Sequence, residues 1–118
     1  MSQLEVRTRT TASGPVIELA GELDHDSAPG ILGLLPGLAI EPGQQLVVEL
    51  GGLTFCDSTG ITVLIAARNV ALAAHSTIAL AAVPDRVSRF FSVVGLDQVF
   101  PTHATIQAAE AAWTPPSG

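Results

Sequence analysis

The chain has 118 residues, which suits one domain and is too short for two. Hydrophobic residues make up 47% of it, enough for a packed core, and the formal net charge is −6 with only five basic residues, all arginine. Nucleic acids and anionic membrane surfaces both select for clustered positive charge, so neither is expected to bind directly. The charge remains compatible with a basic protein partner.

A single cysteine, Cys56, excludes an intramolecular disulfide and a thiolate-rich zinc site. We interpret it as a small buried residue at the end of a strand. No apolar run approaches the roughly 18 residues that a membrane helix requires, and the N-terminus lacks the apolar segment of a signal peptide. We therefore expect a soluble cytoplasmic protein.

The first part of the chain predicts a hairpin followed by a short helix. Residues 4–10 alternate apolar and polar side chains, as half-exposed strands do, and residues 11–15 have turn chemistry before a second strand over 16–20. Residues 27–39 have helical apolar spacing interrupted by proline and glycine. We expect a short helix that ends near Leu35, and then a mobile loop through residues 41–43.

The centre of the chain predicts a buried strand that leads into a capped helix. The aliphatic run over residues 46–50 is typical of a parallel strand buried on both faces. Asp57 and Ser58 then provide the short polar side chains that cap a helix start, and the helix should extend from Gly60 to Ala74. Capping alone would explain both side chains.

The periodicity of this helix predicts one buried and one exposed face. The residues expected to face the sheet are Val63, Leu64, Ala67, Val70, Ala71 and Ala74. The outward stripe should contain Ser58, Thr62, Ile65, Asn69 and Leu72, with Ile61 and Arg68 at its margin. Exposed isoleucine and leucine beside an exposed hydroxyl indicate a docking surface, which also allows a weak homodimer when no partner is bound.

The remaining residues predict two further strands and two helices. A strand over 77–83 completes a parallel strand–helix–strand unit. A short helix should follow Pro84, with Val87, Phe90, Phe91 and Val94 on one face, and end at a left-handed Gly95 that is followed by an apolar contact from Leu96. We expect an edge strand over 97–100 and a last helix over 103–113, capped by Thr102 and packed through Ile106, Ala109 and Trp113. The prediction is one domain over residues 2–113, with residues 114–118 as a frayed tail.

Three groups of residues together resemble a known family. They are Gly21-Glu22-Leu23-Asp24, then Val47-Val48-Glu49-Leu50 with Phe55-Cys56-Asp57-Ser58-Thr59-Gly60, then Val87-Ser88-Arg89 with Gly95-Leu96-Asp97-Gln98-Val99-Phe100. This pattern resembles the STAS domain, and more narrowly the bacterial anti-sigma factor antagonists. The resemblance implies an α/β (α+β sandwich-like) fold, with a small mixed β-sheet of about four to five strands and four helices largely on one face.

The resemblance also implies a function and its residues. In the family, the serine after the aspartate, here Ser58, is phosphorylated by an anti-sigma factor that is also a serine kinase, and a serine phosphatase removes the phosphate. The unphosphorylated antagonist binds the anti-sigma factor and releases the sigma factor. This chain has Thr59 where the family often has serine, so Thr59 is the alternative acceptor. The expected partner-binding residues are Asp24, Asp57, Ser58, Thr59, Gly60, Ile61, Thr62, Ile65, Arg68, Asn69 and Leu72.

A phosphate on Ser58 should act locally. It would add a charge of about −1.5 to −2 beside Asp57. Free N–H groups at the helix start should tolerate it, so the fold should stay intact. The added charge and bulk should instead oppose docking onto a partner, because burying an unpaired dianion is costly.

Two other classes of function are alternatives to an antagonist. A hydrolase would need Ser58 paired with His25, His75 or His103, but the segment around Ser58 lacks the first glycine of a nucleophile elbow, and we expect no catalysis. The same histidines are too scattered for a metal site. The runner-up is a STAS module that does not switch and serves as a nucleotide-binding, scaffold or transport-complex subunit. Gly51-Gly52 is too short for a phosphate-binding loop, and no cofactor is expected.

Overall fold

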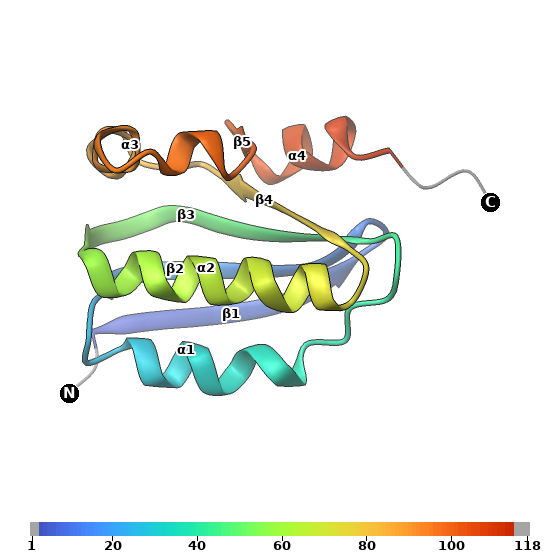
Figure 1. Ribbon diagram of the computed structural model, residues 1–118, viewed down its shortest axis with the longest axis horizontal. Coiled ribbons are helices and arrows are strands. Elements are labelled where there is room, and N and C mark those ends of the chain that lie inside the picture. Colours follow the sequence, from blue (N-terminus) through green and yellow to red (C-terminus); the bar gives the residue numbers. More distant parts are fainter. Residues whose placement is uncertain (1–2, 115–118) are drawn as a thin grey trace.

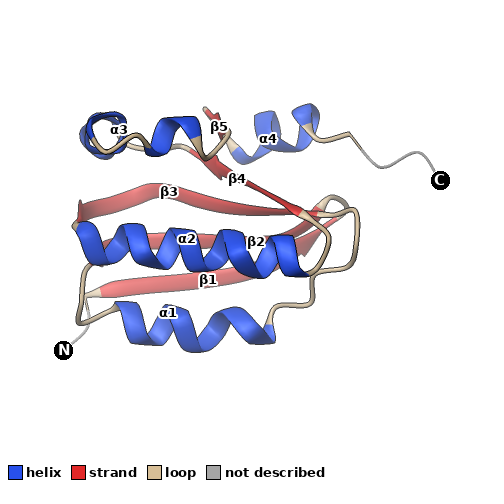
Figure 2. Cartoon of the chain, viewed as in Figure 1, coloured by secondary structure: helices blue, strands red, loops and turns tan. Residues whose placement is uncertain are grey.

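Five strands form one mixed sheet in the computed structural model, which describes residues 3–114 (Figures 1 and 2). The strands are β1 (Leu4–Thr11), β2 (Gly14–Leu23), β3 (Gln45–Cys56), β4 (Thr77–Ala81) and β5 (Thr102–His103). The α-helices are α1 (Ala28–Leu34), α2 (Ser58–Ala73), α3 (Asp85–Val93) and α4 (Ile106–Ala112), and short 3₁₀ turns are η1 (Leu35–Gly37) and η2 (Leu96–Gln98). This mixed sheet with four helices confirms the predicted fold class.

The strands lie in chain order across the sheet. β1 pairs antiparallel with β2, as the predicted hairpin requires, and β2, β3, β4 and β5 then run parallel to one another. α1 ends at Leu34 and gives way to η1, where Pro36 lies, in agreement with the short helix expected there. Because β3 is central, helices on both faces cover it, which explains its near-continuous aliphatic sequence.

Helices cover the two faces of the sheet unequally. The larger core packs α1, α2 and α3 against one face, where Leu46, Val48 and Leu50 of β3 are buried. On the other face Val47 joins a smaller cluster with Ala109 of α4. Three of the four helices therefore lie on one side of the sheet, and Figure 2 shows one of them, α2, in front of the strands.

β3 is longer than the predicted strand over 46–50, because it continues through Gly51 and Gly52 to Cys56. The pairing with β2 shifts register twice along this stretch. A Cβ atom on Gly52 would lie 2.6 Å from the Cβ of Ala20, so this glycine permits a close approach of the two strands. The extension carries β3 to the edge of the sheet where α2 begins.

The predictions for the C-terminal segment were wrong in two places. Residues 96–98 form η2 instead of an edge strand, and the edge strand is β5, at Thr102 and His103. Leu96 and Phe100 are both buried, and their four-residue spacing is helical. The last helix is capped by Thr105 instead of Thr102, with the Thr105 hydroxyl accepting a hydrogen bond from the Ala108 N–H at 3.0 Å.

Other details of this half agree with the sequence. Gly95 is left-handed, with φ of 80°, and Leu96 is buried beneath it. Residue 2 and residues 115–118, parts of the predicted domain and tail, lie outside the described residues, and Thr114 has no regular secondary structure. Within residues 3–114, no helix has both the length and the apolar character needed to cross a membrane.

Candidate phosphorylation and docking site

The polar residues of the site follow two strands that end side by side. Leu23 at the end of β2 pairs with Cys56 at the end of β3, and the Asp57 N–H donates to the Leu23 carbonyl at 3.3 Å. Asp24 and Asp57 therefore leave the sheet at the same edge. In open α/β sheets this carboxyl edge is where ligands and partners usually bind.

Asp57 is the N-cap of α2. Its backbone is extended, and one carboxylate oxygen, Oδ1, accepts hydrogen bonds from the N–H of Thr59 at 2.9 Å and of Gly60 at 3.2 Å. These are two of the N–H groups that a helix start leaves without a partner. Asp57 alone therefore does the capping that the sequence allowed for either Asp57 or Ser58.

Ser58 is the first residue of α2, and its side chain is exposed. Its hydroxyl makes no hydrogen bond to any residue that the structure describes, whereas its carbonyl accepts one from the Thr62 hydroxyl at 3.4 Å. Thr59 is half-buried beside it. Of the two candidate acceptors, Ser58 presents the more accessible oxygen.

A phosphate on Ser58 would find fewer free N–H groups at the helix start than expected. The N–H groups of Thr59 and Gly60 already bond to Asp57. A phosphate at Ser58 would instead lie next to the Asp57 carboxylate, with the positive end of the α2 dipole as its remaining local support. Phosphorylation of Ser58 would therefore place two negatively charged groups, the phosphate and the Asp57 carboxylate, side by side at the start of α2.

The outward stripe of α2 is exposed along its length. Ser58, Thr62, Ile65, Asn69 and Leu72 are all exposed, with fractions of 39% for Ile65 and 47% for Leu72. Their spacing of four, three, four and three residues places them on one helical face.

The other predicted positions on α2 fall where the periodicity placed them, with small differences. Ile61 and Arg68 at the margin are half-buried. The buried face consists of Gly60, Val63, Leu64, Ala67 and Ala71, while Val70 and Ala74, predicted to face inward, are half-buried.

Gly60 and Asp24 fix the position of the backbone around the site. Gly60 is buried, and a Cβ there would lie 2.6 Å from the Cys56 sulfur and 3.0 Å from Cγ of Leu23. This glycine lets α2 start close to the ends of both strands and offers no side chain to a partner. The Asp24 carboxylate accepts from the N–H groups of Asp26 at 3.0 Å and Ser27 at 3.1 Å, which fixes the turn before α1.

The histidines do not form a catalytic arrangement with Ser58 in the described part of the chain. His25 contacts Asp26 at 3.2 Å on the surface, and His75 follows the opposite end of α2. Among residues 3–114, no group of three His, Cys, Asp or Glu side chains is placed to hold a metal ion. Cys56 is half-buried instead of buried, and burial together with the nearby Asp57 charge raises the pKa of its thiol to about 11.

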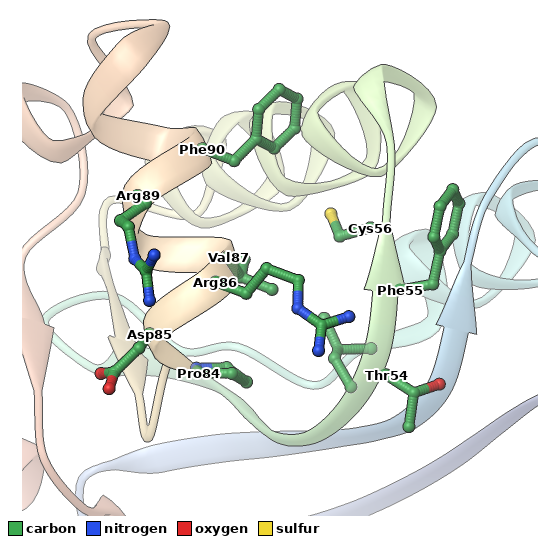
Figure 3. A pocket seen from close by; sticks show the side chains of 10 residues that line it. Thr54, Phe55, Cys56, Pro84, Asp85, Arg86, Val87, Arg89 and Phe90 are labelled. Carbon is green, nitrogen blue, oxygen red and sulfur yellow. The ribbon is translucent and has the colours of Figure 1, made fainter.

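Sequence reasoning missed one feature beside this edge. A cavity of about 640 Å³ lies between the last residues of β3 and the first turns of α3, with Phe55, Arg86 and Arg89 among its lining residues (Figure 3). Phe55, the second-last residue of β3, is 48% exposed, although phenylalanine side chains are most often buried. The available signal was an aromatic residue in the strand end that precedes Asp57.

Comparison with known proteins identifies the class. A sequence model of the STAS domain family, described as "Mlab, STAS domain", matches residues 6–104. The chain therefore belongs to the STAS domain family, and the resemblance seen in its motifs is confirmed. The anti-sigma-B factor antagonist of Listeria monocytogenes is 28% identical over 96 residues, which cover 81% of this chain and 83% of that protein.

Solved structures share the fold. The anti-sigma factor antagonist SpoIIAA in its unphosphorylated form is 22% identical and has a TM-score of 0.74, with 90% of this chain and 93% of that chain covered. A sulfate transporter family protein from Wolinella succinogenes is 17% identical with a TM-score of 0.74, and the coverage is 87% and 86%. The STAS fold thus occurs in both regulators and transporter-family proteins.

Proposed function

We propose that this chain is an anti-sigma factor antagonist controlled by phosphorylation of Ser58. In the unphosphorylated form it binds an anti-sigma factor with serine kinase activity and releases the sigma factor. Phosphorylation of Ser58 by that kinase abolishes binding, and a serine phosphatase restores it. The protein acts by binding and carries out no catalysis of its own. The names of the Listeria relative and of SpoIIAA support this reading.

The observation that carries the proposal is that Asp57 caps α2, whereas the Ser58 side chain is exposed and takes no part in capping. Asp57 caps α2 with two hydrogen bonds, so the exposed Ser58 hydroxyl has no structural bond to give up when it is modified. It lies at one end of the exposed stripe that contains Ile65 and Leu72. A hydroxyl in this position is available to a kinase and is part of the candidate docking surface.

The same arrangement explains how a phosphate would prevent docking. A phosphoserine carries about −1.5 to −2 charges at pH 7. The N–H groups of Thr59 and Gly60 are occupied by Asp57, so a docked partner would have to desolvate this charge beside a second carboxylate. Binding should be lost while the fold stays unchanged.

The test is the Ser58→Asp variant titrated against the anti-sigma factor kinase of the same organism. We expect binding to fall by at least about tenfold, which corresponds to about 1.4 kcal/mol, with an unchanged circular dichroism spectrum. Ser88→Asp is the matched control, because it places the same charge at an exposed serine of α3. Wild-type affinity in Ser58→Asp, or equal losses in both variants, would contradict the proposal.

A second candidate is a STAS module that does not switch and stays permanently docked. It would serve as a nucleotide-binding, scaffold or transport-complex subunit. The likeness to a sulfate transporter family protein favours it. It uses the same α2 stripe as a constant interface and needs no modified serine. Ser58→Asp should then leave the assembly intact when Ile65→Asp disrupts it.

A further inference from the structure

The cavity between β3 and α3 takes no part in the proposed switch and has the size of a small-molecule site. Leu53 to Cys56 form one wall, and Pro84 with the first turns of α3 as far as Phe90 forms the other (Figure 3). Its volume of about 640 Å³ lies within the range of roughly 300–1,000 Å³ that small-molecule pockets occupy.

Two arginines without acidic partners line this cavity. Neither Arg86 nor Arg89 has a carboxylate within salt-bridge distance in residues 3–114, where the recorded pair joins His25 and Asp26. Figure 3 shows the Arg86 side chain extending across the cavity toward the β3 wall. Asp85 also lines the cavity, so the local formal charge is +1 in a chain with a net charge of −6.

The rest of the lining is largely apolar and uncharged. Leu53 and Val87 are buried, Phe90 is half-buried, and Phe55 lies exposed at the rim. The Cys56 thiol points into the cavity in Figure 3. Its pKa of about 11 keeps it protonated at neutral pH, so it does not repel an anion. The cavity thus combines apolar walls with two free cationic groups.

We propose that this cavity binds an organic anion. Arg86, which extends toward the β3 wall, holds its carboxylate, sulfonate or phosphate group, because a guanidinium offers several N–H donors to such oxygens, and Arg89 adds a second positive charge to the lining. Its apolar body packs against Leu53, Val87 and Phe90. The β3 wall ends at Cys56, two residues before Ser58, so an occupied cavity contacts the strand that leads into α2.

The first test is a fluorescence titration with anilinonaphthalene sulfonate, which joins an anionic group to an aromatic body. Two double variants are compared with the wild type. Arg86→Ala/Arg89→Ala removes the cavity cations, and Arg7→Ala/Arg9→Ala removes two exposed arginines of β1. Both have a net charge of −8, that is −6 minus 2, so they differ only in where charge is lost.

We expect the first double variant to lose roughly tenfold or more in affinity for the dye, and the β1 variant to bind as the wild type does. Decanoate should displace the dye, whereas inorganic phosphate at the same concentration, lacking an apolar body, should not. Thr54→Glu adds a negative charge at an exposed position of the lining, so it should weaken binding without affecting folding. It keeps the test decisive if the arginine variant folds poorly.

Amide chemical shifts locate the bound probe. Dye or decanoate should shift residues 53–56 and 85–90 most strongly. Three results would overturn the proposal: equal dye affinity in the two double variants, wild-type affinity in Thr54→Glu, or shifts that lie elsewhere. Failure of wild-type protein to bind either organic anion would overturn it as well. None of these readouts depends on phosphorylation of Ser58 or on a protein partner, so failure here leaves the proposed function standing.

Discussion

The assignment of capping to Asp57 and of signalling to Ser58 makes a quantitative prediction about stability. In Asp57→Ala, at the start of a 16-residue helix, the Thr59 N–H loses its acceptor, and the Gly60 N–H keeps only the backbone carbonyl of residue 57 at 3.0 Å. Loss of an N-cap side chain costs about 1 kcal/mol, within a range of about 0.5–2 kcal/mol. In Ser58→Ala only an exposed hydroxyl disappears, so the change should stay within about 0.5 kcal/mol.

The assay is urea denaturation followed by circular dichroism, with the same variants measured by thermal unfolding. A loss of about 1 kcal/mol should lower the Tm of a domain of this size by about 4 °C. Asp57→Asn is the matched control, because asparagine retains a side-chain oxygen acceptor and caps helices about as well as aspartate. It should retain most of the wild-type stability.

The reverse ranking of the two variants would assign the cap to Ser58. If Ser58→Ala lost about 1 kcal/mol while Asp57→Ala changed little, Ser58 would be the cap. Its hydroxyl would then have a structural role, and modification would disturb the helix instead of acting only at the surface.

Three further predictions concern Gly60, the exposed stripe of α2 and Cys56. Gly60→Ala should lower the free energy of unfolding by about 1–3 kcal/mol in urea denaturation, because its Cβ would lie 2.6 Å from the Cys56 sulfur. A wild-type denaturation midpoint would show that the ends of β2 and β3 shift to make room for the methyl group. Ile65→Asp and Leu72→Asp should leave unfolding within about 0.5 kcal/mol of wild type yet reduce partner binding, and unchanged binding in both would remove the α2 stripe from the interface. Alkylation of native Cys56 by iodoacetamide should stay slow until the pH nears 11, while the unfolded chain reacts from about pH 9; equal rates at pH 8 would contradict the raised pKa.

The Cys56 pKa also gives stability a pH dependence with a defined sign. The pKa of the folded state lies above the ordinary value of 9.0, so the folded chain retains a proton that the unfolded chain releases. The stability associated with the neutral thiol is therefore present below pH 9 and declines as the pH rises toward 11.

The sequence predicted α2 well because its signals are local and repeated. A helix of this length gives several turns over which the apolar face can be recognised, and the aspartate before it is a strong capping residue. The exposure of Ile65 and Leu72 and the burial of Leu64 follow from that periodicity. The sequence could not decide which of Asp57 and Ser58 makes the capping bonds, because both residue types do so.

The remaining features depend on contacts between distant parts of the chain. Gly51 and Gly52 indicate a strand end by propensity, yet β3 continues because Gly52 packs against Ala20 of β2. β5 exists through pairing with β4, where Leu80 and Ala82 donate to the carbonyls of Pro101 and His103. The cavity likewise requires the end of β3 to meet α3, and no local pattern in either segment predicts that meeting.

The most direct measurement is phosphopeptide mass analysis of the protein purified from its own cells, with Ser58→Ala as the control. We expect one phosphate, located at Ser58 and absent from the variant. Phosphate on Thr59 alone would keep a switch and move it to the neighbouring hydroxyl. An unmodified Ser58 under every growth condition, with the partner still bound, would contradict the switch and leave a permanently docked STAS subunit.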